Sequence, residues 1–133
     1  MSSARFPHLY QAVRAGIQIM PDPAPSGRFL GVSPTSGRLG CDALAAAWFA
    51  EFYDRERTED HDATLGQFLS ADLARLYRVL DFDMGPSCPA GPTGSCPHAT
   101  KIRPSLEQKI IHLQDCHGFT REKVADWLET HGL

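Results

Sequence analysis

The sequence has no long hydrophobic run and no excess of basic residues. No stretch approaches the roughly eighteen apolar residues that a membrane-spanning helix requires, and the first residues lack the apolar core of a signal peptide. Thirteen Lys and Arg stand against sixteen Asp and Glu, which gives a formal net charge of −3. Electrostatic binding to nucleic acid or acidic lipid depends on clustered cations and is therefore disfavoured. We expect a cytoplasmic protein without a membrane partner.

The motifs of common catalytic sites are missing as well. The sequence contains no Gly-rich phosphate-binding loop, no HExxH helix and no GxSxG nucleophile elbow. Asp115 with His117, or His112 with Cys116, would be the candidate pairs of base and nucleophile. Adjacent residues such as Cys116 and His117 point about 100° apart on a helix and do not easily form a dyad. The sequence thus identifies no catalytic residue, and we expect a protein that is not an enzyme.

Hydrophobic periodicity predicts an all-α fold of four or five short helices in one domain, residues 1–133. The expected helices of the first part of the chain are His8–Ile19, Ala43–Tyr53 and Thr64–Leu80. Asp42 directly precedes the second of these helices and is placed to cap its free amide groups.

Most of the ten prolines and eleven glycines fall in two stretches, Pro21–Gly40 and Gly85–Pro104. Both are expected to be long loops, which in a compact domain are usually functional or held in place by other contacts. The apolar residues Phe29–Val32 suggest a short extended piece, which we expect to be too short to support a sheet.

The C-terminal region has the clearest helix boundaries. Ser105 and Gln108 have the spacing of a capping box, and Gly118 stands where a helix would end. Thr120 is placed to cap the next helix. Two short helices joined by Gly-Phe-Thr predict a helical hairpin of the helix-turn-helix type.

Thiols and imidazoles gather in the same region. Three of the four cysteines and three of the six histidines lie between Cys88 and His117. Thiolate and imidazole are the ligands that zinc prefers, and His112 and Cys116 lie one helical turn apart. We therefore predict a structural zinc ion that fastens the loop and hairpin of residues 84–133. The predicted ligands are Cys88, Cys96, His112 and Cys116, with His98 and His117 as alternates.

A reading without metal is also open. Seven residues separate Cys88 from Cys96, more than the two to four that are usual between zinc-binding cysteines. These two residues would then be free thiols or a disulfide, and Cys116 would be a small buried hydrophobe. His117 would be a partly buried residue near a helix C-terminus. Cys41 is expected to pack in the core.

The segment HLQDCHGFTREKVADWL, His112–Leu128, resembles the C-terminal signature of a family of short bacterial and phage proteins. That signature is approximately HLNDxHxW(S/T)RExIADW. The family also tends to carry a small-residue helix led by a cysteine, similar to the segment that begins at Cys41, and some members have a CPxC-like loop before the hairpin. The resemblance implies a helical fold and a phage or prophage-like setting, but no chemistry. Gln114 replaces the usual Asn of the pattern, Phe119 replaces the Trp, and Cys116 stands where an acid is common.

The function expected from these observations is that of a small non-enzymatic protein-binding or regulatory module with a protein partner. One alternative is a helix-turn-helix protein that binds nucleic acid, and another is a metal-dependent enzyme. In the helix-turn-helix reading, Arg121–Thr130 would be the recognition helix. Its basic residues are Arg121 and Lys123, but its acidic residues make it a poor match for phosphates. These acidic residues are Glu122, Asp126 and Glu129.

Overall fold

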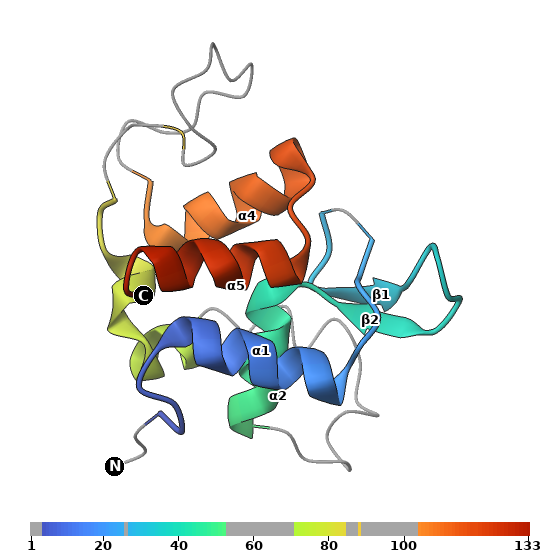
Figure 1. Cartoon of the computed structure of the whole chain (residues 1–133), viewed down its shortest axis with the longest axis horizontal. Coiled ribbons are helices and arrows are strands. Elements are labelled where there is room, and N and C mark those ends of the chain that lie inside the picture. Colours follow the sequence, from blue (N-terminus) through green and yellow to red (C-terminus); the bar gives the residue numbers. More distant parts are fainter. Residues whose placement is uncertain (1–3, 26, 53–70, 85–87, 89–103) are drawn as a thin grey trace.

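The computed structural model describes residues 4–25, 27–52, 71–84, 88 and 104–133 (Figure 1). This part of the chain is rich in helix, as predicted. Its elements are α1 (Leu9–Ile19), β1 (Leu30–Val32), β2 (Leu39–Cys41), α2 (Ala43–Phe52), the 3-10 helix η1 (Arg78–Asp81), α4 (Leu106–His117) and α5 (Arg121–Thr130). Residues 71–76 are also helical.

The fold is not purely all-α, because β1 and β2 form a small antiparallel sheet. Leu30 lies opposite Cys41, and Val32 lies opposite Leu39. The prediction that this stretch is too short for a sheet was wrong, because the partner strand lies only a few residues further along the same loop. Gly37 has a φ of 72°, which favours glycine and lets the chain reverse between the strands.

Helix α2 forms the centre of the core. Every residue from Ala43 to Glu51 is buried, as expected for a helix that is apolar on nearly all sides. Helix α1 crosses it closely, since a Cβ atom added at Gly16 would lie 1.7 Å from the carbonyl oxygen of Ala46. Figure 1 shows α1 in front of α2, and α5 contacts both helices.

The predicted boundaries of the helices His8–Ile19 and Ala43–Tyr53 agree with the structure to within one residue where it describes them. Asp42 Oδ1 accepts a hydrogen bond from the amide of Ala45 at 2.8 Å, which confirms the predicted cap of α2. The predicted helix Thr64–Leu80 is helical over residues 71–76 and gives way to η1, while its first seven residues lie outside the described part.

The C-terminal hairpin forms as predicted. Ser105 Oγ accepts from the amide of Gln108 at 3.3 Å, and Gln108 Oε1 accepts from the amide of Ser105 at 3.0 Å. Gly118 ends α4 in the left-handed conformation. Thr120 Oγ1 then accepts from the amide of Lys123 at 3.1 Å and caps α5. No helix in the described part of the chain is long and apolar enough to cross a membrane.

Candidate metal centre

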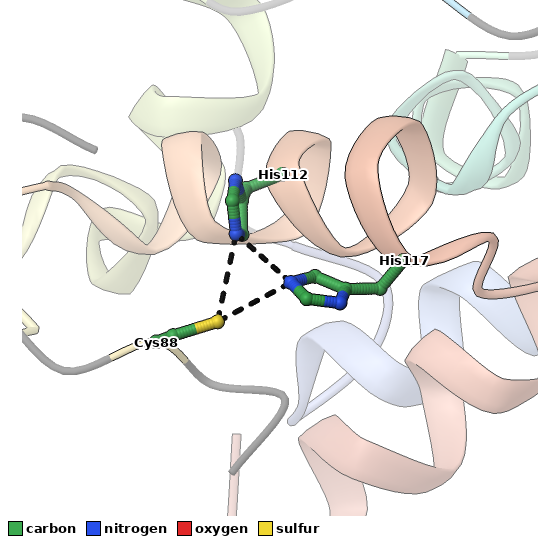
Figure 2. Close-up of side chains that lie close together, drawn as sticks. All are labelled: Cys88, His112 and His117. Atoms are coloured by element: carbon green, nitrogen blue, oxygen red, sulfur yellow. Dashed lines mark hydrogen bonds between the residues drawn. The ribbon is translucent and has the colours of Figure 1, made fainter. Parts of the chain in front are cut away.

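Three potential metal ligands converge beside α4 (Figure 2). The sulfur of Cys88 lies 3.5 Å from His112 Nε2 and 3.3 Å from His117 Nε2. The two Nε2 atoms are 3.1 Å apart. The three side chains therefore lie close enough to hold one metal ion.

Hydrogen bonding alone is a poor explanation for this triangle of contacts. Each imidazole Nε2 has a single site in the ring plane, occupied either by a proton or by a lone pair. Here each Nε2 has two close neighbours, the other Nε2 and the sulfur. All three contacts are hydrogen bonds only if both nitrogens take part in shared, three-centre bonds. A cation at the common centre would instead use one lone pair from each atom.

The distances are also short enough for metal–ligand bonds of ordinary length. With metal–nitrogen bonds of about 2.0–2.1 Å and metal–sulfur bonds of about 2.3 Å, tetrahedral angles separate two nitrogens by about 3.3 Å and nitrogen from sulfur by about 3.5 Å. A planar three-coordinate ion would require about 3.5 Å and 3.8 Å. The observed separations of 3.1, 3.3 and 3.5 Å are at or below the tetrahedral values. Each separation is short enough for one ion to contact both atoms of the pair.

Helix α4 supplies both imidazoles. His112 and His117 are five residues apart and thus about 140° apart around the helix, but their long side chains reach toward each other. The rings meet edge to face, with centroids 4.9 Å apart. His112 is buried and His117 is exposed. Figure 2 shows the sulfur of Cys88 approaching both rings from a neighbouring segment of chain.

The structure brings together two of the predicted ligands, Cys88 and His112, and adds the alternate His117 as the third. Cys96 and His98 lie outside the described residues. Cys116 is not among the three, although it lies only 40° from His112 around the helix. The prediction of Cys116 relied on its i,i+4 spacing from His112, but the imidazole of His117 at i,i+5 has the longer reach.

Parts of the metal-free reading are wrong for the described residues. Cys116 is exposed rather than buried, and His117 is exposed rather than partly buried. Cys88 is a free cysteine, as the main form of the metal-free reading expected, and it is not part of a disulfide.

Cys41 packs in the core as predicted, with no exposed surface. Burial raises the pKa of its thiol to about 12, against the opposing effect of the Arg121 charge. Cys41 does not belong to the group of side chains that converge beside α4.

Comparison of the chain with family models, with curated proteins and with solved structures gives no match. The resemblance of His112–Leu128 to the short phage proteins therefore stays a prediction.

Proposed function

We propose that the protein is a small, non-enzymatic protein-binding module whose C-terminal region is fastened by a structural zinc ion. The observation that carries this proposal is the convergence of Cys88 Sγ, His112 Nε2 and His117 Nε2 on one centre. Zinc suits a mixed set of thiolate and imidazole ligands and accepts a tetrahedral arrangement. A structural site has four protein ligands, and Cys96, His98 and Cys116 are the proposed candidates for the fourth.

The position of the site supports a structural role. A cavity of about 360 Å³ lies between the start of α5 and the segment Pro21–Pro25, and none of the three converging residues lines it. The converging side chains instead join α4 to the chain around Cys88. An ion bound there would hold two segments of the protein together, which is what structural zinc sites do.

The surface of α5 supports a protein partner over nucleic acid. Arg121, the first residue of this helix, is only 3% exposed. Its guanidinium donates to the carbonyl oxygens of Met20 and Pro21, so it is not available to phosphates. The exposed charges of α5 are therefore mainly acidic: Lys123 with Glu122, Asp126 and Glu129. A partner in a phage or prophage setting is what the resemblance of the hairpin implies.

The test is zinc binding by the purified chain and by His112→Ala. We expect one zinc per wild-type chain by elemental analysis, and a melting temperature that falls when a strong chelator removes it. Substitution of a residue that only supports a metal ligand typically weakens metal binding by roughly 10–100-fold. His112→Ala removes a ligand itself and should weaken zinc binding by more than this. Its melting temperature should match that of chelator-treated wild type and should not respond to chelator.

His131→Ala is the matched control, because it removes an exposed imidazole of the same C-terminal region that lies outside the converging group. It should bind zinc like wild type. Equal melting curves with and without chelator, or wild-type chain that takes up no zinc, would refute the proposal. Cobalt substitution in Cys96→Ala, His98→Ala and Cys116→Ala then identifies the fourth ligand, because loss of a ligand changes the visible spectrum.

A further inference from the structure

A buried lysine lies next to the proposed zinc site. Lys109 is on α4, one turn before His112, and is only 5% exposed. Burial lowers the pKa of its ammonium group, while the nearby Cys88 and Asp83 act in the opposite direction. Lysine is almost never buried to this degree without a partner. Its Nζ donates to the carbonyl oxygen of Met84 at 2.7 Å.

The residue that Lys109 holds is close to Cys88 along the chain. Met84 precedes Cys88 by four residues. The amide of Met84 donates to the carbonyl oxygen of Pro104 at 3.1 Å, and the neighbouring Asp83 and Ser105 form an antiparallel bridge. These contacts join residues 83–84 to residues 104–105, just before the chain reaches Cys88. The hydrogen bond from Lys109 attaches Met84, and with it this junction of the two segments, to the helix that carries His112 and His117.

We propose that Lys109 is a positioning residue of the metal centre. It anchors Met84 to α4 and so holds Cys88 at the distance from His112 and His117 that one ion requires. Cys88 follows Met84 by only four residues, so this anchor limits the space within which the sulfur of Cys88 moves before metal binds. A ligand that is already in place loses less entropy on binding, and affinity rises accordingly. This inference rests on the zinc site of the proposed function.

Lys109→Met tests the inference, because methionine has a similar length and apolar stem but no donor. The matched control is Lys123→Met, which removes an exposed lysine of α5. Zinc affinity is measured by competition with a chromophoric chelator, and metal-free stability by thermal melting in excess chelator. We expect Lys109→Met to bind zinc about tenfold more weakly, with a metal-free melting temperature close to that of wild type. Lys109→Arg retains a donor for Met84 and should recover most of the affinity.

The possible results distinguish a failure of the positioning role of Lys109 from a failure of the proposed zinc site. Zinc affinity of Lys109→Met within about twofold of Lys123→Met would overturn the positioning role. A lowered metal-free melting temperature with unchanged zinc affinity would do the same, because Lys109 would then serve the fold alone. If Lys109→Met fails to fold, Lys109→Arg and Lys109→Gln decide, since only the guanidinium is long enough to take the place of the ammonium. Wild-type chain that binds no zinc would refute the proposed function itself.

Discussion

Stability should depend on pH through Asp42, the capping residue of α2. Its carboxylate accepts from the amide of Ala45 at 2.8 Å. Burial raises the pKa of Asp42 from 3.8 to about 7, and the negative charge of Asp115 acts in the same direction. The hydrogen bond from Ala45 and the positive charge of Arg121 oppose this shift. The folded protein therefore keeps a proton on Asp42 that the unfolded chain gives up near pH 4.

The direction of the effect follows from this difference in bound protons. Between about pH 4 and pH 7 the folded state binds more protons at Asp42 than the unfolded state does, so the free energy of unfolding falls as pH rises. The loss is complete above pH 7. At roughly 1.4 kcal/mol per pKa unit, a pKa raised by this much lowers the free energy of unfolding by about 4 kcal/mol at most.

Asp42→Asn removes this dependence without removing the cap, because asparagine caps helices about as well as aspartate. We expect the variant to be more stable than wild type at pH 8, by up to about 4 kcal/mol, and nearly equal to it at pH 4. Urea unfolding at several values between pH 4 and pH 8, with chelator present throughout, measures the difference between the two proteins. Chelator keeps the proposed metal centre empty in both.

Asp81→Asn is the control, because Asp81 is an exposed carboxylate in η1. It should follow the wild-type pH profile. A constant difference between Asp42→Asn and wild type over the whole pH range would show that the carboxyl group of Asp42 does not carry the predicted proton.

Two further substitutions test the packing and the buried polar contacts. Gly16→Ala should lower the free energy of unfolding by about 1–3 kcal/mol. Alanine favours helix, but its Cβ would collide here with the carbonyl oxygen of Ala46. An unchanged urea midpoint would contradict this prediction. Glu51 is buried and accepts hydrogen bonds from the Arg5 amide with both carboxylate oxygens and from the Tyr77 hydroxyl with one of them. Glu51→Ala leaves these donors unpaired and should lower the free energy of unfolding by about 2–4 kcal/mol. Tyr77→Phe should then destabilise the Glu51→Ala variant less than it destabilises the wild type, because the hydrogen bond between the two side chains is already lost.

The sequence predicted those parts of the fold that depend on neighbouring residues. Asp42, the Ser105–Gln108 pair, Gly118 and Thr120 all act within one helical turn, so their spacing is enough to place a helix end. The β1–β2 sheet was missed because a strand of three residues is recognised only together with its partner. The apolar pattern of Phe29–Val32 indicates the first strand but gives no sign of its partner at Leu39–Cys41.

Arg121 shows a second limit of the sequence. Its position at the start of α5 suggested a basic residue on a recognition helix. The structure buries it, because the end of α1 brings the carbonyl oxygens of Met20 and Pro21 to its guanidinium from about a hundred residues away in the chain. Nothing in the spacing around Arg121 indicates those carbonyl groups.

The sequence indicated the region of the converging thiol and imidazole groups, but not which side chains come together there. Thiols and imidazoles concentrated in one segment pointed to Cys88 and His112. The choice between Cys116 and His117 depends on how far each side chain reaches from the last turn of α4. That reach depends on rotamers and on the position of the Cys88 segment, which tertiary contacts determine.

The location of this site relative to the core bears on what the ion would do. The hydrophobic core draws on α1, α2, α5, the sheet and residues 73–80, with Leu106 and Ile110 of α4. Of the three converging side chains, only His112 is buried. Small zinc fingers unfold without metal because the ion replaces a core. The described residues form a hydrophobic core of their own, so removal of the proposed zinc ion should release Cys88 while the helices persist at room temperature. An ion in this position would fix the shape of one surface of a protein that is already folded, which is the role that a binding module requires.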